Sequence, residues 1–186
     1  MKRMLDLFSG LKGASQAFSD DESWEVVTVD INPDMEPDIV CDLTVWQSKL
    51  FDLGEFDLIW ASPPCIEFFR VLAPWCDEYG EPPDLALVNA AMEIISWYQP
   101  KTWVIENTES GHRFIDGVLG GYRQKLGPFY MWGNFPLLAN VKIPRDHKSQ
   151  NDVWSTNPMR SAIKAKVPLE ISQGLMDAIN GQCTLF

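Results

Sequence analysis

The stretch Met-Leu-Asp-Leu-Phe-Ser-Gly, residues 4–10, decides the fold, because a short apolar run ends there in a glycine turn. The run predicts a buried strand over 4–8, and residues 13–18 are typical of a short helix. A strand that passes through a turn into a helix is the opening unit of an open α/β sheet. Such folds bind ligands at the carboxyl ends of their strands, so this turn marks the expected binding edge.

The same alternation continues along the chain. Strands are predicted over 25–29, 38–41, 56–61 and 102–106, and helices over 44–51 and 84–98. This order predicts one α/β domain over residues 1–186, built on a mostly parallel, doubly wound sheet. Segments 129–132 and 141–143 are predicted as further, antiparallel strands, 168–180 as a last helix, and 66–82 as a long loop.

Charge limits the kinds of partner. The chain carries 15 basic and 26 acidic residues, a net charge of −11, which argues against binding nucleic acid by bulk electrostatic attraction. The charge is uneven: residues 1–100 hold 5 basic and 19 acidic residues, and residues 101–186 hold 10 and 7. A contact with a polyanion is therefore expected on the second half, with an ordinary solvated surface as the alternative.

Apolar runs and cysteines exclude other classes. No apolar run approaches the roughly 20 residues of a membrane span, and no signal peptide is visible, so no membrane partner is expected. The four cysteines are irregularly spaced without a C-x-x-C pair, which predicts neither a metal site nor a disulfide framework. A reducing cytoplasm is the expected location.

Three residues at predicted strand ends suggest an adenosine-type cofactor. Gly10 lets the backbone turn tightly beside a ligand, and Asp30 lies 20 residues later, where dinucleotide folds place an acid on the ribose hydroxyls. Asp42 ends the third predicted strand and could accept a hydrogen bond from an adenine amino group. Plain turn chemistry and helix capping are the alternatives. A nicotinamide cofactor is disfavoured because G-x-G-x-x-G is absent.

Two further strand ends carry candidate catalytic groups. Cys65 follows two prolines that would hold its thiol in place, and a thiolate there could act as a nucleophile. Glu106 ends the next strand in an apolar context, where burial should raise its pKa and allow it to share a proton with a substrate. The alternatives are a small buried hydrophobe for the cysteine and a cap or an ion pair for the glutamate.

The motifs DLFSGLKG, VDINP, CDL, SPPCIEFF and ENT resemble, in order and spacing over roughly residues 4–136, those of the DNA cytosine-5 methyltransferases. The segment AKVPLEIS resembles the last family motif more weakly. The resemblance implies that Cys65 attacks C6 of cytosine, that Glu106 holds N3 and the amino group, and that Asn107 orients the loop. It implies a set of residues that bind S-adenosylmethionine: Phe8, Ser9, Gly10, Leu11, Gly13, Asp30, Ile31, Asp42, Leu43 and Pro64.

The chain departs from the family pattern at several places. Lys12 replaces a glycine of the first turn, and Phe69 stands where the family has a serine after its cysteine. Both arginines of the family's Q-x-R-x-R are missing at 124–128, and Arg123 and Lys125 could substitute from shifted positions. Only residues 137–165 stand in place of a large target-recognition domain, as in compact phage members, which would act in the host cytoplasm.

The expected substrate is DNA, duplex or single-stranded, and a duplex target would have to be flipped out of the stack. The open alternatives are RNA or a free nucleotide as substrate, an amino-methyltransferase, and an inactive cofactor-binding partner subunit. A second subunit or self-association could supply target recognition. The basic residues expected to contact phosphates are Arg70, Lys142, Arg145, Lys148, Arg160 and Lys164.

Overall fold

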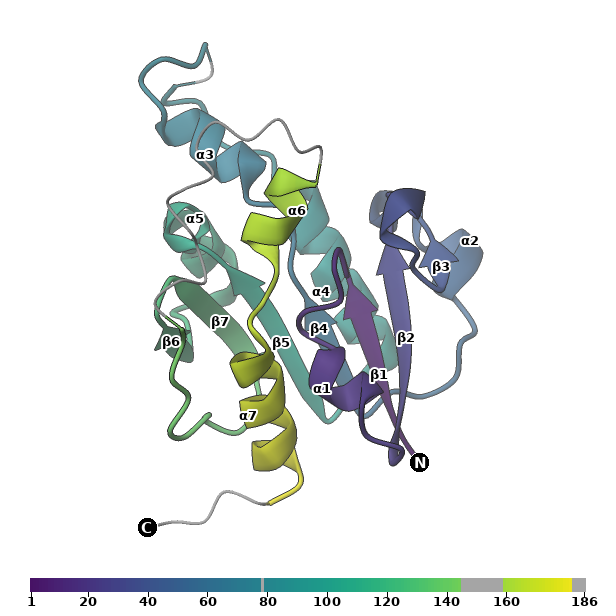
Figure 1. Ribbon diagram of the computed structural model, residues 1–186. Coiled ribbons are helices and arrows are strands. Elements are labelled where there is room, and N and C mark those ends of the chain that lie inside the picture. The colour runs from purple at the N-terminus through teal and green to yellow at the C-terminus, as the bar shows by residue number, and fades with distance from the viewer. Residues whose placement is uncertain (78, 145–158, 182–186) are drawn as a thin grey trace.

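A seven-stranded sheet forms the centre of the computed structural model, which describes residues 1–77, 79–144 and 159–181 (Figure 1). Its strands lie in the order β3-β2-β1-β4-β5-β7-β6. The strands are β1 (Lys2–Leu7), β2 (Trp24–Asp30), β3 (Ile39–Val40), β4 (Leu58–Ala61), β5 (Thr102–Asn107), β6 (Gln124–Leu126) and β7 (Phe129–Asn134). The helices are α1 (Gln16–Ser19), η1 (Pro33–Met35), η2 (Leu43–Val45), α2 (Gln47–Leu50), α3 (Ile66–Leu72), α4 (Ala86–Tyr98), α5 (Glu109–Leu119), α6 (Arg160–Ala165) and α7 (Leu169–Ile179).

Strand direction confirms the predicted fold class. The first five strands are parallel neighbours, and β7 runs antiparallel beside β5, so the sheet is mostly parallel with helices on both faces. This is the Rossmann-like arrangement that the sequence predicts. The register pairs Leu7 with Ala61 and Ala61 with Ile105. The residues that follow these three strands therefore reach the same edge of the sheet.

Alternation along the strands divides the core into two layers. Leu5, Leu7 and Ile59 pack on the face that α4 and α5 cover, while Met4 and Trp60 pack on the face that α1 and α7 cover (Figure 1). All five side chains are completely buried. Strands buried on both faces need apolar residues at almost every position, which explains the continuous apolar runs of the sequence.

Two sequence predictions were wrong. Residues 141–143 form no strand, because β6 occupies the sheet edge beside β7, and Val141 and Ile143 instead pack against the second core layer. The loop predicted over 66–82 begins with helix α3, whose Phe68 and Val71 are buried one turn apart. Exposed apolar neighbours on the same helix, Phe69 among them, hide this period in the sequence. Helix α5, which the sequence does not predict, contains two glycines, and these lower helix propensity.

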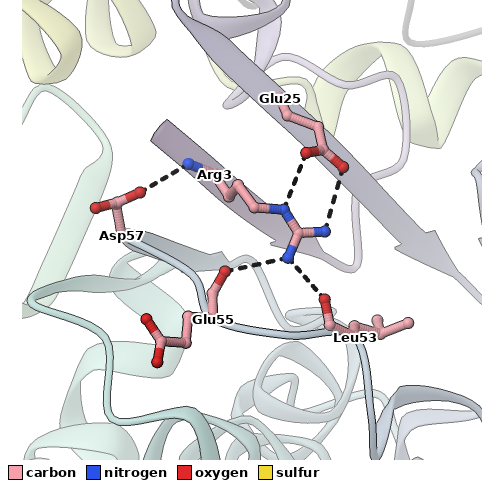
Figure 2. A network of polar contacts seen from close by, with 5 residues as sticks. All are labelled: Arg3, Glu25, Leu53, Glu55 and Asp57. Carbon is pink, nitrogen blue, oxygen red and sulfur yellow. Dashed lines mark hydrogen bonds and ion pairs between the residues drawn. The ribbon is translucent and has the colours of Figure 1, made fainter. Parts of the chain in front are cut away.

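At the opposite edge, Arg3 joins the amino ends of the strands (Figure 2). Its guanidinium donates to both oxygens of Glu25 at 3.0 and 3.2 Å and to the carbonyls of Leu53 and Glu55 at 2.6 and 3.1 Å. Its backbone N–H donates to Asp57 Oδ2 at 2.8 Å. One side chain thus holds the segment that leads into β4 against β1 and β2.

Replacing Arg3 by alanine should destabilise the fold by about 1–3 kcal/mol, because two carbonyl acceptors lose their donor together with the ion pair. Glu25→Ala should cost less than about 1 kcal/mol, because its side chain is 43% exposed and surface ion pairs contribute little. Urea unfolding of both variants measures the difference. Equal losses in the two variants would mean that the carbonyl contacts contribute nothing.

Candidate active site

A cavity of about 270 Å³ lies at the carboxyl edge of the sheet. Its walls come from the turn after β1, the ends of β4 and β5, the first residue of β7, and α6 with the residues that follow it. Figure 1 shows α6 across this edge, above the strand ends. The predicted site residues that line the cavity are Phe8, Ser9, Gly10, Leu11, Gly13, Pro64, Cys65, Glu106, Asn107 and Lys164.

The turn after β1 has an unusual backbone. Phe8, Gly10 and Lys12 all have positive φ, at 58°, 47° and 56°. Two of them carry side chains that rarely adopt this conformation, and strained residues of this kind cluster at ligand-binding sites. Ser9 lies between them, and its buried Oγ has no hydrogen-bond partner among the described residues. A buried hydroxyl at a cavity wall without a partner is available to a ligand.

Two hydrogen bonds hold Lys12 at the position where the resembling family has a glycine. Its backbone N–H donates to the Ser9 carbonyl at 2.7 Å, which closes the turn. Its ammonium donates to the Glu36 carbonyl at 2.6 Å, just after η1. These contacts offset the left-handed backbone and tie the glycine turn to the segment that follows β2.

The acid at the end of β2 contacts the glycine turn directly. Asp30 accepts from the Gly10 N–H at 2.9 Å through Oδ2, and from the Asn32 N–H at 2.9 Å through Oδ1. It is half-buried and lies beside the cavity rather than in its wall. The carboxylate thus supports the turn and keeps lone pairs for a further donor.

The other three residues predicted to bind the cofactor also lie outside the cavity wall. Ile31 is 65% exposed, and Leu43 is buried in the core. Asp42 caps η2, accepting from the N–H and the hydroxyl of Thr44 at 2.9 and 2.8 Å. These hydrogen bonds lower the pKa of the Asp42 carboxyl. Asp42 therefore caps a helix, which is the alternative to a cofactor contact that the sequence left open.

Asn107 holds the cysteine loop against β5. Its amide donates to the Pro63 carbonyl at 2.9 Å, and its Oδ1 accepts from the Thr108 N–H at 2.9 Å. Helix α5 packs so closely here that a Cβ on Gly111 would lie 2.3 Å from that Oδ1. Cys65 follows the held loop as the half-buried N-cap of α3. Asn107, the residue after Glu106, thereby holds the cysteine loop at the carboxyl end of β5.

Two carboxyl groups are buried in the cavity wall. Glu106 is 6% exposed at the end of β5. Asp6, which the sequence analysis does not single out, is 1% exposed and accepts from the Ser15 hydroxyl at 2.5 Å. Burial raises the pKa of Asp6 from 3.8 to about 7, the Ser15 hydrogen bond opposes this shift, and the nearby Asp30 adds to it. The signal for Asp6 was present in the sequence as one acid inside an apolar run.

The suggested substitutes for the missing arginines lie elsewhere. Arg123 donates to the Phe135 carbonyl at 2.6 Å, and Lys125 donates to the Tyr130 hydroxyl at 2.6 Å. Neither is among the residues that line the cavity. The basic residues of the cavity wall, as far as the structure describes it, are Lys164 and Lys166, both from the α6 segment.

The remaining predicted phosphate contacts are scattered. Arg70 pairs with Glu67 on α3 at 3.1 Å, Lys142 is exposed, and Arg160 begins α6 with a buried Nε that has no partner among the described residues. Arg145 and Lys148 fall outside the described residues. Within the described ranges, no group of three acids, cysteines or histidines could hold a metal ion, and no helix is long and apolar enough to cross a membrane.

Asp6→Asn should remove a pH dependence of stability. The native carboxyl binds its proton up to about pH 7, while the unfolded one releases it near 3.8, so stability falls as pH rises between these values. Between these pH values, the free energy of unfolding of the wild type should fall relative to that of the variant by up to about 1.4 kcal/mol per pH unit. Above about pH 7 the two free energies should change with pH in parallel. Urea unfolding from pH 5 to 8, with the exposed Asp20→Asn as control, measures this; parallel curves throughout would refute it.

Comparison with known proteins gives one related sequence of clear similarity. No family model matches the chain. The chain is 36% identical over 120 residues to a protein of Frog virus 3 (isolate Goorha) named "Probable DNA (cytosine-5)-methyltransferase". The match covers 59% of this chain and 55% of the viral protein, so the chain spans about half the length of this relative.

Among solved structures, the chain is similar to a "putative DNA modification methyltransferase encoded within prophage" from E. coli. The superposition has a TM-score of 0.49 with 16% sequence identity, and it covers 78% of this chain and 51% of that protein.

Proposed function

We propose that this chain transfers a methyl group from S-adenosylmethionine to C5 of cytosine in DNA, through a covalent adduct on Cys65. One observation carries the proposal: a single cavity is lined by the strained glycine turn, by Cys65 and by Glu106. The viral relative at 36% identity supports the same reaction class. We also propose that residues 1–186 act as one catalytic domain.

The cavity has features that suit this cofactor. The partnerless Ser9 hydroxyl and the left-handed turn around Gly10 offer polar contacts, and Asp30 keeps acceptor capacity beside them. The buried Asp6 and Glu106 make the wall acidic, which favours a ligand with a positive sulfonium centre. When bound, S-adenosylmethionine supplies an electrophilic methyl group. The proposed binding residues are Phe8, Ser9, Gly10, Leu11, Gly13, Asp30, Ile31, Asp42, Leu43 and Pro64. Of these, Asp42 would contribute its exposed carboxylate, and Ile31 and Leu43 would contribute apolar contacts.

In the proposed mechanism, the thiolate of Cys65 adds to C6 of cytosine, and an Sγ–C6 bond forms. The Glu106 carboxyl hydrogen-bonds N3 and the amino group, so that the ring accepts the electron pair and C5 becomes nucleophilic. C5 takes the methyl group, which leaves S-adenosylhomocysteine, and then loses its proton to water. The Sγ–C6 bond breaks at that step, which restores the ring and releases Cys65 as the thiolate. Asn107 has a positioning role, because it holds the Pro63 carbonyl of the cysteine loop.

The proposed substrate surface is small. The described basic residues proposed to contact DNA phosphates are Arg70, Lys142, Arg160 and Lys164, together with Arg145 and Lys148. Residues 137–165 leave little surface for reading base edges in the major groove. Specificity should therefore be short or relaxed unless a second subunit or self-association supplies it.

One observation favours a second candidate, an inactive cofactor-binding subunit: Arg123 and Lys125 bind other groups and leave the cavity without the family's arginines. An amino-methyltransferase is less well supported, because its chemistry needs no thiol at the place that Cys65 occupies.

The covalent step is tested with DNA that contains 5-fluorocytosine. The wild-type protein, given S-adenosylmethionine, should form a stable adduct at Cys65, because no proton can leave C5. Cys65→Ser should form none, since a hydroxyl is a far poorer nucleophile at neutral pH, and it should still bind the cofactor. Mass spectrometry of tryptic peptides locates the adduct.

The control is Cys76→Ser, which changes a half-buried cysteine outside the cavity wall and should keep full adduct formation. An adduct on Cys41 or Cys76 would overturn the mechanism. Cofactor binding without any adduct would support the inactive-subunit alternative.

A further inference from the structure

A buried tryptophan of β4 is hydrogen-bonded to the wall of the cavity. Trp60 is completely buried in the core layer that α1 and α7 cover, and its indole N–H donates to Ser62 Oγ at 2.8 Å. Ser62 is half-buried and lines the cavity. Side chains two residues apart on an extended chain point to the same face of the sheet, which brings this pair together. One directed bond therefore joins the core to the cavity wall.

Burial alone does not explain this bond. A buried indole N–H usually finds a partner, yet the buried Nε1 of Trp24, in the same core layer, has none among the described residues. A branched aliphatic side chain would also suit a parallel strand and would bring no polar group into the core. The partner that Trp60 does find lies three residues before Cys65. The bond thus acts on the loop that carries the proposed nucleophile.

This loop has few free torsions. Ser62 precedes Pro63, and Pro63 precedes Pro64. A residue before a proline is restricted to extended backbone, and each proline ring fixes its own φ. The orientation of Ser62 is therefore passed on to Cys65 with little freedom between them.

The loop is held from both faces of the sheet. On the face that α1 and α7 cover, Trp60 binds the Ser62 side chain. On the face where α5 packs, the Asn107 amide donates to the Pro63 carbonyl at 2.9 Å. The Ser62 backbone N–H also donates to the Leu7 carbonyl at 3.2 Å, which sets its place along the sheet. One side-chain bond would fix a point of the loop, and the second fixes its orientation.

We propose that Trp60 is a positioning residue that acts through the Ser62 hydroxyl and holds the Cys65 sulfur at the place from which it attacks the substrate. This inference rests on the proposed function, because it takes the covalent step on Cys65 from it. Trp60 itself is completely buried and is not among the residues that line the cavity. Its indole N–H therefore acts on the reaction only through Ser62.

The test measures the single-turnover rate of adduct formation with 5-fluorocytosine DNA in the presence of S-adenosylmethionine. Ser62→Ala removes the acceptor, and Trp60→Phe removes the donor but keeps an aromatic ring. Each should slow adduct formation about tenfold to a hundredfold, the range expected when a reacting group is misplaced by up to about 1 Å. Ser62→Thr, which keeps the hydroxyl, should restore most of the rate.

Affinities for S-adenosylhomocysteine and for DNA with ordinary cytosine separate positioning from binding. Both should change less than about threefold in these variants, because a group that only places the reacting atom leaves ground-state binding intact. A loss of either affinity as large as the loss of rate would show a binding role for Ser62 and overturn the inference.

A double-mutant cycle separates the hydrogen bond from the two residues. If the bond carries the effect, Trp60→Phe combined with Ser62→Ala should be no slower than the slower single variant, since either change already breaks the bond. Losses of rate that multiply in the double variant would overturn the inference. If Trp60→Phe does not fold, the comparison of Ser62→Ala with Ser62→Thr decides the question alone.

Trp132→Phe is the matched control. Trp132 is 1% exposed, and its indole N–H donates to Asp116 Oδ1 at 2.7 Å, outside the residues that line the cavity. The control should lower the melting temperature about as much as Trp60→Phe does and keep the wild-type rate of adduct formation. An equal loss of rate in the control would show a general effect of stability and overturn the inference.

Two outcomes separate this inference from the proposed function. Wild-type rates in Ser62→Ala and Trp60→Phe would overturn the positioning role and leave the proposed function standing. A wild-type protein that forms no adduct would refute the proposed function, and the positioning role with it.

Discussion

The register between β1, β4 and β5 is the constraint on which the site depends. Leu7, Ala61 and Ile105 are paired across the sheet, so the glycine turn, the cysteine loop and Glu106 all follow at one edge. A slip of one residue would turn every side chain of a strand to the other face, and burial on both faces prevents this. Two hydrogen bonds reinforce the alignment: Ser62 N–H to the Leu7 carbonyl, and the Asn107 amide to the Pro63 carbonyl.

The buried acids give the site its electrostatic character. Asp6 and Glu106 lie in the cavity wall, and burial is the largest cause of the rise in the pKa of Asp6 to about 7. Their desolvation is a cost that a purely structural cavity would have no reason to carry. A cationic sulfonium ligand would offset that cost. The net charge of −11 leaves the proposed DNA binding to a few local cations.

The fold was predictable because buried parallel strands must be apolar almost throughout, and each apolar run of the sequence ends at a turn. The same reasoning brought Gly10, Cys65 and Glu106 to one edge. It missed α3, which forms inside a predicted loop, and Asp6, which is buried beside Ser15, because tertiary contacts decide both. The AKVPLEIS segment, which resembles the last family motif, lies against the glycine turn: a Cβ on Gly13 would lie 2.3 Å from the Val167 carbonyl.

Transfer of labelled methyl groups from S-adenosylmethionine to DNA, followed by nucleoside analysis, tests the central claim most directly. If the shared cavity performs the chemistry that its residues suggest, the label should appear as 5-methylcytosine, in single-stranded or duplex DNA. Label in N4-methylcytosine or N6-methyladenine would contradict the role of Cys65. Absence of transfer by a protein that binds the cofactor would show that the cavity is a binding site without catalysis.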